Sequence, residues 1–350
     1  MKKYITRMGD ASIAYMSADE IISDIRTATE DAAKKGKVDP LTQDEMDLIA
    51  DITMCPDTVV SVEPGRQVVS TTDIGATRIE YNCGMPLDRC DEILIKERAL
   101  GGDSSDFGYM DYSFKPAKAA TDIFEAMQMQ NALDRATMPL LYGAMPNLGL
   151  YTKPDGPCDN WNELLPQGKI KEAQEAQEAA VELAVKDMVY VAEKMYGVGA
   201  DGINFDTTGA AGDADFLATL EAVEQIKEKC PNLGIEMGMA GEFVLGVHGR
   251  LKYKGQRLAG LYPHKQVKLA EQAGVDIFGA VVNTNCSKSF AWNIARVCTL
   301  LKRCVQDAEI PVHANVGMGV NAMPMYVTMP TDVVTRADKA MVEICKIDGL

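Results

Sequence analysis

From about residue 118 onward, two patterns of apolar and polar positions alternate along the chain. Each repeat begins with a helical pattern that stops at a glycine or a proline, and a short apolar run of strand length follows the stop. The expected helices cover residues 118–135, 170–196, 213–229, 264–273, 288–307 and 331–345. The runs expected to be strands read MPLLYGAMPN, ADGINFDTT, LGIEMGMAGE, VDIFGAVVNTN, PVHANVGMG and IDGL.

Strands that alternate with helices in one direction predict a parallel α/β fold. Within that class, a closed TIM-type (β/α)8 barrel fits better than an open doubly wound sheet. Polar residues stand at the carboxyl ends of at least four different strands, whereas an open sheet gathers them at one switch point. The last strand begins only at Ile347, close to the final residue Leu350, so we expect a barrel that is incomplete at its C-terminus.

The first part of the chain has a different pattern, with helices and short β-prone runs. Capping boxes at residues 17–20 and 42–45 each precede an apolar helical pattern. Residues 56–86 hold short β-prone runs between turn residues, which fit a β-hairpin or a flap. We therefore divide the chain into an N-terminal extension, residues 1–117, and a barrel, residues 118–350.

Several of the predicted strands carry polar residues on one of their two faces. In GINFD, Asn204 and Asp206 share one face and the apolar residues share the other, because side chains alternate along a strand. In the same way, LGIEM carries Glu236, and PVHANV carries His313 and Asn315. If the apolar faces meet the helices, these polar side chains point to the barrel axis near its carboxyl-terminal mouth, where barrel enzymes place their chemistry.

Other interpretations of this polar face stay open. The groups could satisfy one another or cap loops, although several buried carboxylates, amides and an imidazole are costly without a purpose. Glu242, just past the third strand, is either a further mouth carboxylate or a solvated loop charge. Asp206, Glu236 and His313 could hold a metal ion. No predicted strand carries an inner lysine for a Schiff base, and no GxGxxG or P-loop is present, so the reactive group of such a mouth is missing.

Charge and composition narrow the partners. With 35 Lys and Arg against 51 Asp and Glu, the formal net charge is −16, which argues against nucleic acid and anionic membranes as main partners. The sequence has no signal-peptide or membrane-spanning run, so we expect a cytoplasmic protein. Its 9 cysteines form no CxxC pair, which fits reduced core thiols better than disulfides. Because large acidic barrels often assemble, we also expect a homo-oligomer.

A family resemblance covers almost the whole chain. It is carried, in order from residue 7 to residue 350, by the motifs RMGD, DYSFKP, PLLYGAMPNLGLY, PDGP, GADGINFDTTGAAGD, MAGEFVLGVHG, LAGLYPH, NTNCSKS, AWNIAR, NVGMGV and VTRADKAMVEI. These motifs closely resemble the dimethylamine:corrinoid methyltransferases of methylotrophic methanogens. The resemblance implies methyl transfer from dimethylamine to the Co(I) corrinoid of a cognate corrinoid protein, giving methylamine and methyl-Co(III), in methanogenesis from methylamines.

The resemblance also implies a reason for the missing reactive group. In that family the residue after the position of Leu350 is pyrrolysine, encoded by an amber codon that is otherwise a stop. The chain is then expected to end because that codon was read as termination, and the 350-residue product is expected to be inactive and, with open strand edges, poorly soluble. The cyclic imine of pyrrolysine is the intrinsic electrophile that receives the amine, and no permanently bound cofactor is implied in this chain.

Roles for the residues of this chain rest on the strand pattern alone. Asp206 or Glu242 would serve as acid or as charge partner to the ammonium group, and the adduct would be ordered by His313, Asn315, Asn204 and Glu236. Three alternatives remain: a metal-dependent barrel lyase or hydrolase, a non-catalytic protein that docks the corrinoid carrier, and a gene whose stop is real. The extension, residues 1–117, could be a lid or a contact for the corrinoid protein.

Overall fold

The computed structural model describes residues 2–63, 68, 70–72, 104–106, 118–120, 141–246, 249–325 and 329–350. The chain forms two compact units, which are described one at a time. Unit 1 combines Met1–Asp106 with Gly279–Leu350, and unit 2 is Phe107–Phe278. The functional division that we expected between residues 117 and 118 stays a prediction.

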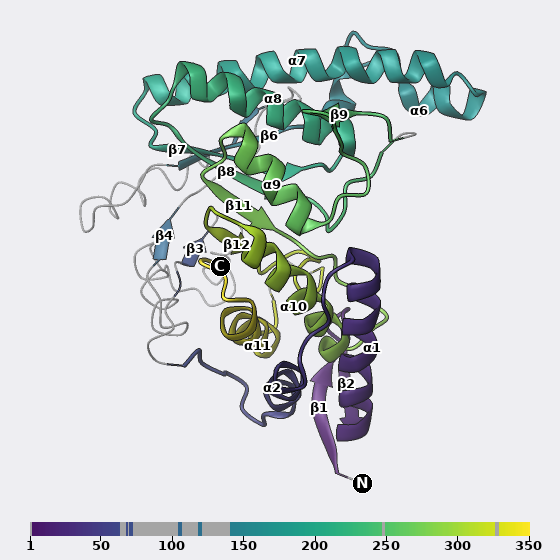
Figure 1. Ribbon diagram of the computed structural model, residues 1–350, viewed down its shortest axis with the longest axis vertical. Helices are drawn as coiled ribbons and strands as arrows, with labels where there is room; N and C mark the ends of the chain where they lie inside the picture. The colour runs from purple at the N-terminus through teal and green to yellow at the C-terminus, as the bar shows by residue number, and fades with distance from the viewer. Residues whose placement is uncertain are drawn as a thin grey trace, which may run out of the picture. The chain divides into compact units, whose positions relative to one another are not determined.

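Unit 2 is built on a mainly parallel sheet (Figure 1). Its hydrogen-bonded order is β5 (Lys118–Ala120), β6 (Leu141–Met145), β7 (Gly202–Thr208) and β8 (Gly234–Met239), with β11 (Ile277–Ala280) next to β8. β6, β7 and β8 are parallel to one another, and β5 pairs with β6 in the antiparallel sense. The predicted parallel α/β fold is therefore confirmed, whereas closure into a barrel stays a prediction.

One predicted helix is wrong at its start. Residues 118–135 have a helical period, but Lys118–Ala120 form strand β5, because their backbone pairs with residues 143–145 of β6. Pairing with a neighbouring strand has here overridden a local periodicity, as tertiary contacts often do. The rest of that segment lies outside the described residues.

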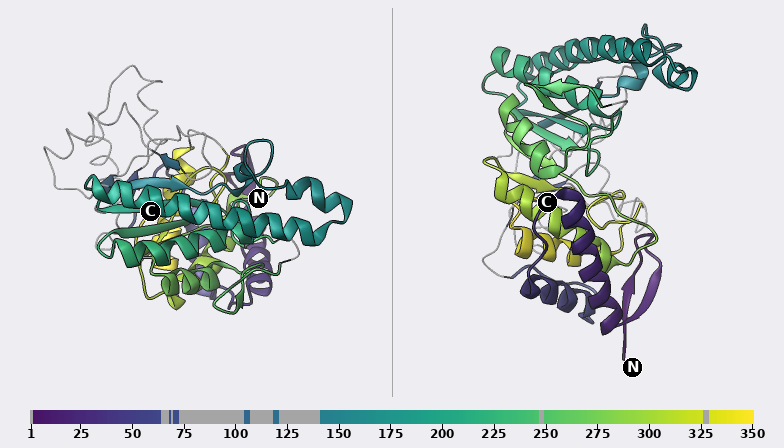
Figure 2. Two further views of the ribbon diagram at one scale, coloured as in Figure 1. Left: turned by 90° about the horizontal axis from the view of Figure 1, so that it is seen from above. Right: turned by 45° about the vertical axis from the view of Figure 1, so that its right-hand side comes forward.

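Helices cover the apolar face of this sheet. Ile203, Phe205, Ile235 and Met237 alternate along β7 and β8, and all are 1% exposed or less. Figure 2 shows α7 (Ile170–Gly197) and α8 (Asp213–Lys229) lying along the sheet, and both contact β7. The remaining elements of unit 2 are η2 (Leu148–Tyr151), α6 (Trp161–Leu164), η3 (Leu165–Gln167), the short strands β9 (Lys252–Tyr253) and β10 (Gln256–Arg257), and α9 (Pro263–Ala273).

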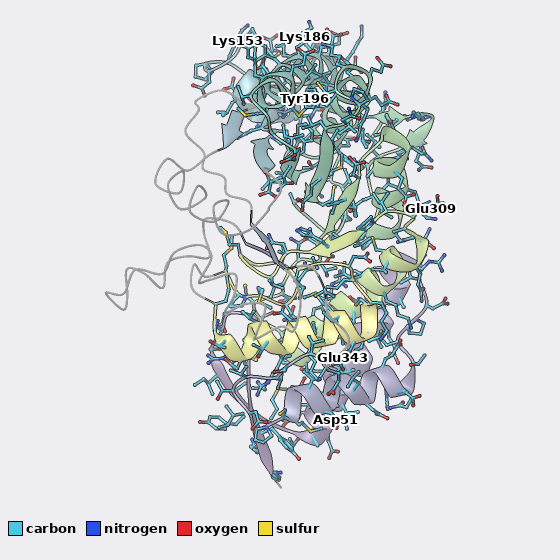
Figure 3. All side chains as sticks on the ribbon, turned by 90° about the vertical axis from the view of Figure 1, so that its left-hand side faces the viewer. Asp51, Lys153, Lys186, Tyr196, Glu309 and Glu343 are labelled. Carbon is cyan, nitrogen blue, oxygen red and sulfur yellow. The ribbon has the colours of Figure 1, made fainter. Side chains whose placement is uncertain are left out.

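The helix boundaries follow from local signals in the sequence. α9 begins with Pro263, whose fixed φ suits the first turn, and it ends at Gly274, whose φ of 104° is left-handed. α7 turns Lys186 and Tyr196 outward, as Figure 3 shows, and buries its alanines and valines. Among the described helices, none combines the length and the apolar content that crossing a membrane requires.

Unit 1 is formed by two segments that are far apart in the sequence. The first contains the antiparallel hairpin of β1 (Lys3–Arg7) and β2 (Ile13–Ser17), then α1 (Ala18–Gly36) and α2 (Gln43–Met54). The second contains α10 (Phe290–Asp307), β12 (Val312–Ala314), α11 (Thr331–Ala340) and the π-helical turn η4 (Met341–Cys345). β3 (Ser70–Thr72) pairs in parallel with β4 (Ser104–Asp106), so residues 70–72 are not one arm of a hairpin; most of the predicted flap lies outside the described residues.

The long helices α1 and α10 form the core of unit 1, where they lie side by side (Figure 1). Both predicted capping boxes are confirmed, at the starts of α1 and α2. Buried hydroxyl groups of Thr29 and Thr299 lie 2.8 Å apart across the two helices, and Arg296 pairs with Asp31 at 3.1 Å. The hairpin of β1 and β2 was not predicted.

The end of the chain pairs with β12. His313 and Gly349 form a parallel bridge, the backbone N–H of Asp348 donates to the carbonyl of Val312 at 2.9 Å, and that of Ala314 donates to the carbonyl of Gly349 at 3.1 Å. Ile347 and Leu350 are 3% exposed. The start of a sixth parallel strand at residue 347 is thus confirmed.

Candidate active site

Asn204 on β7 and Glu236 on β8 face the same side of the sheet in unit 2. They are register partners, and residues in register on neighbouring parallel strands point to one face. Each is only 4% exposed, so an amide and a carboxyl group have both been taken out of water. Among the described residues, Oδ1 of Asn204 has no hydrogen-bond partner. A buried acceptor of this kind is suited to a ligand that donates a hydrogen bond.

Asp206 extends this polar face toward the carboxyl end of β7. Its Oδ1 accepts a hydrogen bond from the backbone N–H of Thr207 at 2.7 Å. Thr207 has a φ of 56°, which a β-branched residue rarely adopts and which costs about 1–3 kcal/mol. The register with β8 also shifts between Phe205 and Thr208. A strained bulge next to a carboxylate at a strand end is a common feature of functional sites.

Two glycines leave space around these side chains. A Cβ atom added at Gly238 would lie 3.1 Å from Oδ1 of Asp206 and 3.8 Å from Oδ1 of Asn204. On the other neighbouring strand, Gly143 is the register partner of Asn204. Since neither glycine carries a side chain, the face that holds Asn204, Asp206 and Glu236 stays open to a small ligand. Sequence reasoning missed Gly238, whose role depends on the strand register.

Asp215, in the first turn of α8, fixes the loop that follows β7. Its Oδ2 accepts hydrogen bonds from the backbone N–H groups of Gly209 at 2.9 Å and Ala211 at 3.4 Å. The side chain is fully buried, and this burial raises the pKa of Asp215 to about 7, although the backbone hydrogen bonds act in the opposite direction. The signal for this residue was an aspartate three positions after the glycine pair of GAAGDAD, which we had interpreted only as a tight turn.

Glu242 lies just beyond β8 and is 6% exposed. It is therefore a buried carboxyl group and not a solvated loop charge. Its place on the loop differs from that of Glu236, which stands on the strand itself. A role for Glu242 as a mouth carboxylate stays a prediction.

His313 and Asn315 belong to unit 1. His313 is half-buried on β12, and Asn315 stands one residue past the end of that strand and is exposed. Asn321, which the sequence did not suggest, organises this end of β12: its Oδ1 accepts from the N–H of Val282 at 2.9 Å and its Nδ2 donates to the carbonyl of Asn315 at 2.8 Å. The structure thus brings Asn204, Asp206 and Glu236 onto neighbouring strands of one unit, with His313 and Asn315 on a strand of the other.

Metal binding receives no support from the described side chains. In the part of the chain that the structure describes, no group of three or more His, Cys, Asp or Glu residues is placed to hold a metal ion. The candidate set of Asp206, Glu236 and His313 is therefore not proposed as a metal site.

A polar, strained face at the carboxyl end of a parallel sheet is where α/β enzymes hold their substrates. The fold and the site together define an α/β enzyme whose site is built from carboxyl and amide groups. The family model described as "Dimethylamine methyltransferase (Dimeth_PyL)" matches residues 2–350. The chain therefore belongs to the dimethylamine methyltransferase family and is a methyltransferase, as its motifs had indicated.

One solved structure was also compared with the chain. The crystal structure of CobT from Thermus thermophilus has 9% sequence identity and a TM-score of 0.15, over 94% of this chain and 96% of that chain. A likeness this weak carries no argument about the fold or the function.

Proposed function

We propose that this methyltransferase passes a methyl group from dimethylamine to the Co(I) corrinoid of a cognate corrinoid protein, leaving methylamine. The observation that carries the proposal is the buried polar face of Asn204, Asp206 and Glu236 beside the open position at Gly238. Dimethylammonium is a small cation with two N–H donors, and buried carboxylate and amide oxygens are the acceptors that such a cation prefers. The small space above Gly238 suits its methyl groups.

The roles of the residues follow from their positions. Glu236 and Asp206 would balance the charge of the bound ammonium group, and Oδ1 of Asn204 would accept a hydrogen bond from it. Desolvation strengthens each of these interactions, because charges attract more strongly in a low dielectric. The strained turn at Thr207 would hold the Asp206 carboxyl group in one orientation, since its Oδ1 is tied to the turn's N–H. Positioning the methyl carbon for in-line attack is then the main task of the protein.

We further propose that pyrrolysine follows Leu350 in the active protein. Gly349 is in parallel register with His313, so the same register would set the residue after Leu350 beside Asn315. Side chains alternate along a strand, and that residue would share a face with His313 and Asn315. Both can donate hydrogen bonds to a polar group there. Pyrrolysine supplies an electrophilic imine, and the partner's corrinoid supplies the methyl acceptor.

Three further features belong to this proposal. The parallel sheet, apolar on its helix face and polar on the other, would close into a (β/α)8 barrel when further strands are present. The protein would act in the cytoplasm, and it would assemble with copies of itself. The 350-residue chain without pyrrolysine would be inactive in methyl transfer.

The experiment is methyl transfer from carbon-13-labelled dimethylamine to a Co(I) corrinoid protein, using enzyme that carries pyrrolysine after Leu350. Glu236→Gln and Asn204→Ala are each expected to lower kcat/KM roughly 10- to 100-fold, the effect of losing a charge-assisted or buried hydrogen bond of about 1.5–3 kcal/mol. The matched control is Glu228→Gln, an exposed carboxylate on α8, which is expected to change nothing. Unchanged kcat/KM in the first two variants would refute the assignment of this face as the amine site.

A further inference from the structure

The hairpin of β1 and β2 has its apolar side chains on the outside. Ile5 is 61% exposed, Ile13 59% and Tyr15 61%, whereas Thr6, which points the other way, is 1% exposed. The inner side packs on α1 and α2. In an ordinary surface hairpin the polar residues face water and the apolar ones face the core. This hairpin therefore presents an apolar face that its own unit leaves uncovered, which we call the hairpin face and define as Lys3, Ile5, Ile13 and Tyr15.

The hairpin face is continuous across both strands. Ile5 is the register partner of Tyr15, so their side chains stand directly opposite each other. Ile13 is the partner of Arg7 and lies next to Tyr15 along the same side of the hairpin. The three side chains expose roughly 400 Å² together, which is within the size range of the largest apolar patches on protein surfaces, and such patches mark interaction sites. A standard interface buries about 800 Å² per partner, so this patch would supply about half of one.

The hairpin is held firmly at its turn. The N–H of Gly9 donates to the carbonyl of Lys288 at 2.7 Å, and Met8 bridges to Ser289 at the start of α10. The contact is so close that a Cβ atom at Gly9 would lie 2.2 Å from the carbonyl oxygen of Asn285. A preformed surface loses little conformational entropy when a partner binds, which favours its use in recognition.

Charge indicates the kind of partner. Residues 1–17 carry Lys2, Lys3 and Arg7 against Asp10, a formal charge of +2 (three minus one), in a chain whose net charge is −16. The rest of the chain is therefore at −18 (−16 minus +2). A basic, apolar hairpin is complementary to an acidic protein surface, and the most abundant such surface around this chain is another copy of itself.

We propose that the hairpin face docks on an acidic surface of a second copy of this chain. Ile5, Ile13 and Tyr15 would form the desolvated centre of the contact, and Lys2 and Lys3 would form a charged rim. Figures 1 and 2 show the hairpin running along α1 at the edge of unit 1. The inference deepens the self-assembly named in the proposed function, and it is independent of the methyl-transfer chemistry.

The test is the mass of the purified chain in solution, measured by light scattering after size exclusion, before and after substitution of the hairpin face. The unmodified chain is expected to have a mass that is a multiple of 38.0 kDa at micromolar concentration. The double variant Ile5→Glu with Tyr15→Glu is expected to raise the dissociation constant at least 100-fold and to give the 38.0 kDa monomer with an unchanged circular dichroism spectrum. The control is Val59→Glu, which also places a carboxylate on an exposed apolar residue of unit 1.

A second arm tests the charged rim. Lys2→Glu with Lys3→Glu is expected to weaken self-association, as is high salt, because both remove the attraction to an acidic surface. A monomeric unmodified chain, or a double hairpin variant that keeps the mass of the unmodified chain, would overturn the proposal. So would a hairpin variant that keeps its mass but no longer accepts the corrinoid protein, because the hairpin face would then belong to that partner. Loss of methyl transfer without a change of mass concerns the proposed function alone.

Discussion

Replacement of Asp215 by asparagine is expected to flatten the dependence of stability on pH in unit 2. The carboxyl group is fully buried, and its Oδ2 accepts from the N–H groups of Gly209 and Ala211. An asparagine amide can keep its oxygen on the same two N–H groups, and it carries no charge at any pH. The substitution therefore removes the titration and preserves the loop that follows β7.

The sign of the effect follows from the direction of the pKa shift. Burial raises the pKa of Asp215 from 3.8 to about 7 in the folded state, so the folded protein holds a proton that the unfolded chain releases. The stability that comes from this protonated carboxyl group is fully present below the unfolded pKa and is lost as the pH rises through the folded one. A shift of about three pKa units at about 1.36 kcal/mol each corresponds to about 4 kcal/mol between acid and pH 8.

The assay is urea denaturation of the unmodified chain and of Asp215→Asn at a series of pH values from 4 to 8. The variant is expected to match the unmodified chain near pH 4 and to exceed its free energy of unfolding by up to about 4 kcal/mol at pH 8. Asp155→Asn, at an exposed position in the same unit, controls for the loss of one negative charge. If the difference between Asp215→Asn and the unmodified chain stayed constant across the whole series, Asp215 would not be the titrating group and the reasoning would be wrong.

Three other substitutions test separate parts of the structure. Gly238→Ala would place a methyl group 3.1 Å from the Asp206 carboxylate, and in steady-state assays it is expected to raise KM for dimethylamine at least tenfold while stability changes little; an unaltered KM would show that the amine lies elsewhere. Phe205→Ala empties a fully buried site and is expected to cost about 3–5 kcal/mol in urea denaturation, against less than about 0.5 kcal/mol for Val198→Ala, which is 77% exposed; equal effects would contradict the assigned core. Ser17→Ala removes the capping side chain of α1 and is expected to cost about 1 kcal/mol, measured in the same way, and no loss would mean that the cap is not formed in solution.

The repeating part of the fold could be predicted because its signals are local. The expected helix at residues 213–229 coincides with α8 (Asp213–Lys229), and that at residues 170–196 with α7 (Ile170–Gly197). Period, capping residues and stop residues all act within a few positions of one another, so they can be seen in the sequence. The alternation in GINFD also predicted correctly which side chains of β7 are apolar and buried and which form the polar face.

Other features depended on contacts that the sequence does not reveal. The hairpin of β1 and β2 carries apolar residues on its outer face, so its alternation does not show the usual outer polar face of a surface hairpin. Strand β5 is defined by pairing with β6, against its own helical period. Both are cases in which the position of a neighbouring segment decides the local structure.

The candidate site was predicted in part for the same reason. Strand alternation identified Asn204 and Glu236, and the structure pairs them in register. Gly238 and Asp215 were missed because their roles depend on a register and on a loop conformation, which leave no periodic signal. The part of the site that follows Leu350 rested on the family motifs, since composition and spacing indicated only that a reactive group was missing.

The most direct test of the central claim compares two forms of the protein in one assay. The 350-residue chain and the same chain continued through pyrrolysine and the residues that follow it are each mixed with labelled dimethylamine and a reduced corrinoid protein, and labelled methylamine and methyl-Co(III) are followed together. Our account predicts equal amounts of both products with the longer form and neither with the 350-residue chain. Turnover by the 350-residue chain alone, or a longer form that transfers methyl groups only from other amines, would contradict it.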